Sequence, residues 1–291
     1  MQFSEIGQQL RAYRMESGLK AEEIAARLGV SRAALYRYEK GEVIKLDTVK
    51  RLAELLKISP LTLLGIGVEY YSRPIGFLER LRQMEESADQ ILHIGEALCY
   101  LTTTDYYDAT IAQIFEEIAS QSAADRTKVE AASEHVLTAL KTRKQMFAVR
   151  RPSVITVMST GPLQRLLRNG IGGGVLVLSE RLRAQCRDVA RREVERIADL
   201  MESEPIGLQI GVNTSAEVSS QFILLRNGAR ASLAINPFPT DCLPNNQTGV
   251  AMITSAEDAI NAHQRVAEQA WRDAAKGTAA AQLIRKMLVD V

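Results

Sequence analysis

The N-terminal fold is decided by residues 30–41, which read Val30-Ser31-Arg32-Ala33-Ala34-Leu35-Tyr36-Arg37-Tyr38-Glu39-Lys40-Gly41. Ser31 predicts a helix start, because a serine hydroxyl at that position accepts a hydrogen bond from a free amide of the first turn. Gly41 predicts the helix end, since glycine closes a helix without steric strain. Leu35 and Tyr38 are three residues apart and share one face. So short a helix is marginal alone in water, so neighbouring helices must hold it.

The other face of this predicted helix carries two arginines, two alanines and a tyrosine. They are Arg32, Ala33, Ala34, Tyr36 and Arg37. Small residues allow close approach to a base edge, and an arginine can bond guanine through two parallel hydrogen bonds. This combination favours a helix that lies in the major groove of DNA.

The flanking sequence predicts four more helices. Apolar residues recur at helical spacing in segments 6–14, 19–28, 47–57 and 59–64. Gly29 separates the second segment from Arg32, and a short turn led by glycine joins two helices at a steep angle. The pattern therefore predicts a helix-turn-helix within a five-helix domain.

Residues 6–65 resemble the lambda-repressor-like domain of Cro/XRE-type transcription regulators. The resemblance rests on residues 24–31, 35–41 and 46–59. It implies binding of double-stranded operator DNA, with residues 31–39 as the recognition helix. The DNA-contacting residues that it implies are Arg32, Ala33, Ala34, Tyr36 and Arg37 near the bases, together with Ser31, and Lys20, Arg14 and Lys40 near the phosphates.

Two positions depart from the family pattern. Lys20-Ala21 stands where the family has Thr-Gln, so the hydroxyl cap and the amide that touches DNA are both missing. Lys20 can still bind a phosphate as a point charge. Lys45 replaces a common capping serine before the fourth helix. A domain of this kind can also serve as a packing module or mediate protein contacts, which is the alternative to DNA binding.

Composition agrees with a two-domain protein of the cytoplasm. The chain has 291 residues, and residues 1–57 hold 11 Lys and Arg against 8 Asp and Glu, whereas the remainder holds 25 against 27. The slight excess of positive charge therefore lies in the N-terminal part. Three scattered cysteines favour a reducing compartment over a disulfide framework. The first residues show no signal peptide, and no apolar run reaches membrane-spanning length.

Residues 67–150 predict a helical linker and dimerisation region between domains at 1–66 and 151–291. Gly65, Gly67 and residues 70–74 indicate the connection itself. One long helix is expected to carry Phe77, Leu78, Leu81, Met84, Ala88, Ile91, Leu92, Leu98 and Leu101. Further helices are expected at 106–119 and 125–148. Their apolar stripes need partners, either within the chain or across a homodimer interface.

The period of the pattern changes after residue 150. Strand-like runs occur at 153–158, 174–178, 207–212, 221–226, 231–235 and 249–254. Helical stretches lie between them at 162–168, 179–201 and 255–276. Strands interleaved with helices predict an α/β domain around one mixed sheet. Arg226-Asn227-Gly228 between two runs predicts a hairpin turn.

This C-terminal part resembles the phospholipase-D-like sensor halves found behind some prokaryotic DNA-binding domains. The resemblance rests on the predicted hairpin, residues 236–239, residues 249–255 and the final helix with Trp271. The active enzymes need an H-x-K pair, which His93, His135 and His263 do not form. The resemblance therefore implies a sensor without that chemistry.

The remaining motifs indicate no catalysis, no cofactor and no metal. The glycines at 170–174 follow a predicted helix and precede a strand, which favours a turn over a phosphate loop. No H-E-x-x-H, G-x-S-x-G or Walker lysine is present. The sequence therefore predicts a dimeric, operator-binding regulator whose C-terminal domain senses a small-molecule effector. One alternative is a constitutive repressor or antitoxin-like module that only oligomerises or binds protein. Another is an enzyme with a regulatory DNA-binding domain.

Overall fold

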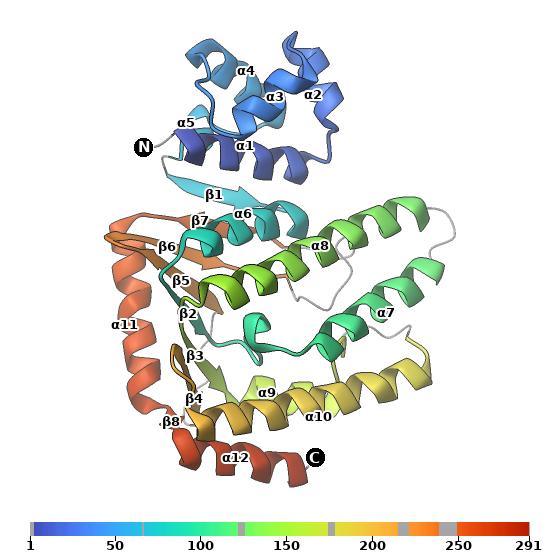
Figure 1. The fold of residues 1–291 in the computed structure, drawn as a ribbon, viewed down its shortest axis with the longest axis vertical. Helices are drawn as coiled ribbons and strands as arrows, with labels where there is room; N and C mark the ends of the chain where they lie inside the picture. The colour runs from blue at the N-terminus through green and yellow to red at the C-terminus, as the bar shows by residue number, and fades with distance from the viewer. Residues whose placement is uncertain are drawn as a thin grey trace.

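A computed structural model describes residues 3–65, 67–121, 126–173, 178–214, 221–238 and 249–290. Residues 3–65 form a cluster of helices at one end of the molecule (Figure 1). They are α1 (Phe3–Ser17), α2 (Ala21–Leu28), α3 (Arg32–Glu39), α4 (Leu46–Leu56) and α5 (Pro60–Leu63). The predicted five-helix domain is therefore present.

The core of this domain consists of the apolar stripes that the sequence predicted. Leu10, Ile24, Leu35, Leu52 and Leu63 come one from each helix, and all are fully buried. Complete burial of such a side chain contributes about 1.5–3 kcal/mol. These side chains hold α2 and α3, which are only two turns long, in place.

The rest of the chain is built on an eight-stranded sheet among the described residues, with the order β1-β7-β6-β5-β2-β3-β4-β8. The strands are β1 (Val68–Tyr71), β2 (Gln90–Ile94), β3 (Ser153–Ser159), β4 (Leu208–Asn213), β5 (Phe222–Asn227), β6 (Arg230–Ile235), β7 (Ala251–Thr254) and β8 (Ala275–Lys276). β2, β3 and β4 are parallel, and the other pairings are antiparallel. The predicted mixed sheet is confirmed.

Helices cover both faces of this sheet (Figure 1). The α11 helix (Glu257–Asp273) packs on one face, over Leu92, Val157 and Phe222. The helices on the opposite side are α6 (Pro74–Ser87), α7 (Asp105–Gln121), α8 (Arg126–Arg150), α9 (Thr160–Asn169), α10 (Glu180–Ser203) and α12 (Gly277–Asp290), with a short 3-10 turn at Tyr100–Thr102. We call the sheet and these helices the body.

The prediction of one long helix through Leu101 is wrong. The α6 helix ends at Ser87, and Gln90–Ile94 is a strand paired with both β3 and β5. A short continuous apolar run is compatible with a buried strand as well as with a helix, so its spacing does not distinguish them. Pairing with β3, 63 residues further along the chain, and with β5, 128–136 residues further along, decides it.

The connection predicted after Gly65 contains a strand that the sequence did not indicate. Val68–Tyr71 pairs with β7 as an outer strand of the sheet. The α1 helix lies directly beside this strand and α6 (Figure 1). Glu16 of α1 accepts hydrogen bonds from the backbone N–H of Ser72 at 2.7 Å and of Arg73 at 3.0 Å. The helical domain is therefore docked on the body.

Two predicted turns are present. Gly228 adopts a left-handed conformation between β5 and β6, which explains the glycine of the predicted hairpin. Gly170, also with positive φ, ends α9, and residues 171–173 form a turn. The predicted strand at 174–178 lies outside the described residues, apart from Leu178. Among the described helices, none is both long and apolar enough to span a membrane.

Candidate nucleic-acid interface

The start and end of α3 follow from its own sequence. The Ser31 hydroxyl accepts a hydrogen bond from the Ala34 N–H at 3.1 Å, as an N-cap does. Gly29 adopts a left-handed conformation at the end of α2, which allows the chain to turn within three residues. The two helices are thus joined by the turn that the sequence predicted.

The inner face of α3 is fixed to α1 at very short range. A β-carbon on Gly7 of α1 would lie 2.5 Å from the carbonyl oxygen of Tyr38 and 2.6 Å from that of Glu39. Leu35 is fully buried, and Ala34 is only 9% exposed. The prediction that Ala34 faces the bases is therefore wrong, because the side chain lies on the packed side of the helix.

A charged pair completes this inner face. Arg14 Nε donates to Glu39 Oε1 at 2.6 Å, and Arg14 Nη2 donates to Glu39 Oε2 at 3.1 Å. Burial alone would lower the pKa of Arg14, but the hydrogen bonds and the charge of Glu39 raise it. The Arg14 side chain is 17% exposed. The structure therefore gives its guanidinium a partner within the domain, which argues against the predicted phosphate contact.

The outer face of α3 is basic and accessible. Arg32, Ala33, Arg37 and Lys40 are exposed, and Tyr36 is half-buried. These are five of the residues predicted to contact DNA. Figure 1 shows α2, α3 and α4 on the side of α1 that faces away from the body. A duplex can therefore approach α3 without meeting the sheet.

The ion pairs that the two arginines of this face form are exposed and can be exchanged. Arg32 Nη1 lies 2.8 Å from Glu22 Oε1, and its Nη2 donates to the Tyr36 hydroxyl at 3.3 Å. Arg37 Nε lies 3.6 Å from Glu42 Oε2. Exposed ion pairs contribute about 0–1 kcal/mol. Exchanging them for contacts to a base or a phosphate therefore costs little.

Lys20 precedes α2 and is exposed. Its backbone N–H donates to Glu23 Oε2 at 2.9 Å, so Glu23 satisfies one helix-end group although the hydroxyl cap is missing. The predicted role of Lys20 as a phosphate contact is compatible with this position. The sequence reading did not single out Val43 and Leu46, which are 70% and 75% exposed around the start of α4.

The comparisons with known proteins agree with the N-terminal geometry. A family model described as a helix-turn-helix domain matches residues 5–64. No curated protein matches the chain.

Among solved structures, the chain is similar to TrmBL2, an archaeal chromatin protein whose structure is described as showing a novel mode of DNA binding. The match has 10% identity and a TM-score of 0.35, and it covers 79% of this chain and 61% of that one. This chain therefore spans less than two thirds of that protein's length, and so distant a likeness supports no conclusion about the body.

The family match and the exposed basic face of α3 lead to the same conclusion. The chain therefore carries an N-terminal helix-turn-helix DNA-binding domain.

Proposed function

We propose that this protein is a Cro/XRE-type transcription regulator that binds operator DNA sequence-specifically through α3. One observation carries this function: one face of α3 packs tightly on α1, while the opposite face is exposed. Gly7 and the Arg14–Glu39 pair fix the helix, and Arg32 and Arg37 project from the opposite face. A rigid helix with arginines on its outer face is what direct reading of base edges in the major groove requires.

The contacts divide into two kinds. Arg32 and Arg37, with Ala33 and Tyr36 between them, supply the base-reading surface, and the absence of Gln at position 21 leaves α2 without an amide reader. Lys20, Lys40 and the Ser31 end of α3 supply phosphate contacts, which position the domain and make binding sensitive to salt.

The operator-binding form is a homodimer in this proposal. One two-turn helix offers few base contacts, and two such helices read half-sites about 34 Å apart. The apolar faces of α6, α7 and α8 are largely used within the chain, because Phe77, Phe115 and Leu140 belong to one buried core. The support for dimerisation is therefore the small size of the reading surface.

The body acts as a sensor for a small-molecule effector in this proposal, and it has no catalytic role. The non-catalytic, phospholipase-D-like character of the body belongs to the same proposal. The docking of α1 on β1 and α6 supports sensing, because a change in the body is transmitted directly to the helix that supports α3. An effector shifts DNA binding only as far as its affinities for two arrangements differ.

The test is selection of bound duplexes from a randomised library by the full chain. We expect enrichment of a motif with two half-sites about one helical turn apart. Enrichment of a single half-site would contradict the proposed dimer but not the proposed sequence-specific DNA binding. Binding without enrichment of any sequence would contradict the regulator, and a constitutive, sequence-tolerant module would then describe the protein better.

A further inference from the structure

A concentration of positive charge lies in the body. Residues 165–192 hold seven arginines, no lysine and two acidic residues, which is a net charge of +5 in a chain whose net charge is +1. They include the end of α9 and the first half of α10. Figure 1 shows α10 beside α12 at the end of the molecule opposite to the helix-turn-helix domain. These arginines therefore lie away from a duplex that α3 binds, and they need another explanation.

Three of these arginines form a row on α10. Arg183, Arg187 and Arg191 follow each other at intervals of four residues, and all three are exposed. Residues four apart are neighbours on a helix surface, so like charges at this spacing destabilise a helix. Among the described residues, the guanidinium groups of Arg183 and Arg187 form no ion pair. Arg191 donates from Nη1 to the Leu288 carbonyl oxygen at 3.0 Å, which leaves its charge without a carboxylate.

The basic row is fixed in place beside α9. A β-carbon on Gly170, which directly follows α9, would lie 2.8 Å from the backbone nitrogen of Arg187. This close approach brings Arg168 of α9 to the same open hollow as Arg187 and Arg191, with a volume of about 380 Å³. The arginines of two helices are therefore gathered on one surface.

The second half of α10 carries mainly the opposite charge. The row continues to Glu195 and Asp199, and Glu202 follows three residues later. Their side chains are 50%, 65% and 39% exposed. Among the described residues, Arg285 of α12 is the one basic partner of all three carboxylates, so two negative charges remain unbalanced. The exposed face of α10 is thus basic in its first half and acidic in its second half.

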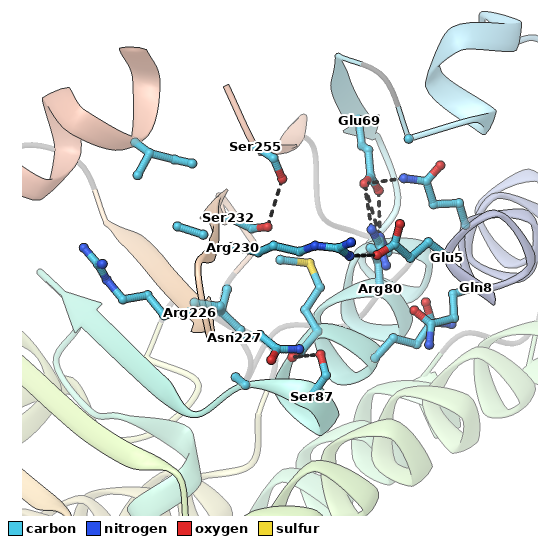
Figure 2. Close-up of a pocket in the computed structure, with 18 of the residues that line it drawn as sticks. Glu5, Gln8, Glu69, Arg80, Ser87, Arg226, Asn227, Arg230, Ser232 and Ser255 are labelled. Atoms are coloured by element: carbon cyan, nitrogen blue, oxygen red, sulfur yellow. Dashed lines mark hydrogen bonds and ion pairs between the residues drawn. The ribbon is translucent and has the colours of Figure 1, made fainter. Parts of the chain in front are cut away.

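The charged groups between α1 and the body show the contrast. Figure 2 shows Arg80 beside Glu69, and Arg230 of the β5–β6 hairpin beside Glu5 of α1. Each of these arginines has a carboxylate of the same chain as its ion-pair partner. The basic and acidic halves of α10 lie on one straight element and cannot fold onto each other. Their neutralisation therefore requires a partner from outside the chain.

The two halves of α10 are complementary to each other. A two-fold axis that crosses the helix near residue 193 places the first half of one copy over the second half of another. Arg191 then lies opposite Glu195 of the second copy and Arg187 lies opposite Asp199, and symmetry forms each pair twice. Rows of residues four apart are also the ridges along which helices most often pack.

A second copy fits this surface better than a nucleic acid does. The row from Arg183 to Arg191 covers eight residues, or about 12 Å of helix. A polyanion that continued along the helix would meet Glu195 and Asp199, which repel it. Val289 of α12 is 86% exposed and follows the residue whose carbonyl binds Arg191. It adds an apolar side chain near the row, and the centres of protein interfaces are apolar.

We propose that α10 is the surface through which two copies of this chain associate, with the basic half of each α10 on the acidic half of the other. This inference rests on the homodimer of the proposed function, and it adds the surface and the ion pairs. Because α10 lies at the end opposite to the helix-turn-helix domain, the contact leaves α3 of both copies exposed (Figure 1).

Sedimentation equilibrium of the full chain measures the association. We expect a dimer that weakens as the salt concentration rises, because salt screens ion pairs at a surface. Arg187→Glu and Asp199→Arg should each weaken the dimer at least tenfold, since each places two like charges opposite each other twice. An equimolar mixture of these two variants should associate again, because both pairs of the mixed dimer then carry opposite charges.

The mixture separates a contact between copies from an effect on the fold, because a misfolded variant is not rescued by a second one. Arg126→Glu on α8 is the matched control. Its arginine is 62% exposed and paired with Glu130, so its replacement should leave the dimer unchanged.

A chain that stays monomeric up to the highest concentration tested would overturn the proposal. So would a dimer that Arg187→Glu leaves unchanged, or two monomeric variants whose mixture stays monomeric. A monomer that loses affinity for random duplex on Arg187→Glu would identify the basic half as a polyanion site instead.

Selection of bound duplexes tests the proposed function separately. A chain that selects an operator without associating through α10 would disprove this surface and leave sequence-specific DNA binding standing. A chain that associates through α10 but enriches no sequence would disprove the regulator and leave the surface standing.

Discussion

Gly7 of α1 lies so close to Tyr38 at the end of α3 that a β-carbon would meet the Tyr38 carbonyl oxygen at 2.5 Å. This contact sets the position of the recognition helix against the helix that joins it to the body. Backbone on both sides leaves little room for relaxation, so the position accepts glycine only.

Gly7→Ala should therefore destabilise the helical domain by about 1–3 kcal/mol, the usual effect of overpacking a core. Urea unfolding followed by circular dichroism measures it. The sign of the change in unfolding free energy serves as the control. At an open helical position the same substitution stabilises a protein by about 0.4–1 kcal/mol. An increase in stability would show that α1 and α3 are not packed at this distance.

Arg37→Ala should weaken binding to the selected operator by about 1–3 kcal/mol if Arg37 makes a bidentate base contact, and it should change binding to random duplex much less. Fluorescence anisotropy on the two duplexes measures the difference. Arg192→Ala on α10 is the matched control and should affect neither. Equal losses on both duplexes would remove Arg37 from the base-reading set.

Lys20→Ala should lower affinity for every duplex and make the salt dependence shallower, by about 0.9 in the slope of log K against log salt for one lost phosphate contact. Titrations between low and moderate salt measure the slope. Arg14→Gln should leave the slope unchanged, because Arg14 is paired with Glu39. A shallower slope for Arg14→Gln would restore the phosphate contact that the structure argues against.

Glu79 makes the contact between α1 and α6 sensitive to acid. Burial alone would raise the pKa of Glu79, but hydrogen bonds from Arg82 and the charge of Arg11 lower it below the ordinary glutamate value of 4.5. Arg11 Nε lies 3.0 Å from the Glu79 carboxylate. Because the folded-state pKa is the lower one, the carboxylate contributes stability above pH 4.5 that is lost as the pH falls through the folded-state pKa.

Glu79→Gln should therefore lower the free energy of unfolding at pH 7. The difference in this free energy between the variant and the unmodified protein should shrink as the pH falls below 4.5. Urea unfolding between pH 7 and pH 3.5 measures that difference. A difference that stays the same across this range would mean that the Glu79 charge does not stabilise the fold.

The α3 helix was predictable because its signals are local. The Ser31 hydroxyl and the amide it caps are three residues apart, and Gly29 turns the chain immediately before it. Leu35 needs only a neighbouring apolar stripe to become buried. Interactions of this range do not depend on the rest of the fold, so the helix-turn-helix could be found from residue types and spacing.

The set of DNA-contacting residues was only partly predictable. Arg32 and Arg37 are exposed as predicted, but Ala34 faces the core and Arg14 faces Glu39. Spacing on a helical wheel says which residues share a face, and it does not say how the helix is rotated against its neighbour. The contact with Gly7, far away in sequence, determines that rotation.

In the body, the sequence did not distinguish a strand from a helix at β2. Its apolar run fits a helix or a strand equally well, and only pairing with β3 and β5 makes it a central strand. The contact between Glu5 and Arg230 could not be predicted from the sequence either, since the two residues are 225 positions apart.

By itself, the sequence determined the five N-terminal helices, the turn before α3 and the mixed α/β class of the body, because capping, turn formation and hydrophobic periodicity act over a few residues. The tertiary structure decided which face of α3 is exposed, that residues 68–71 and 90–94 are strands, and that α1 docks on β1 and α6. Those features depend on contacts between distant segments, whose geometry exists only once the chain has folded.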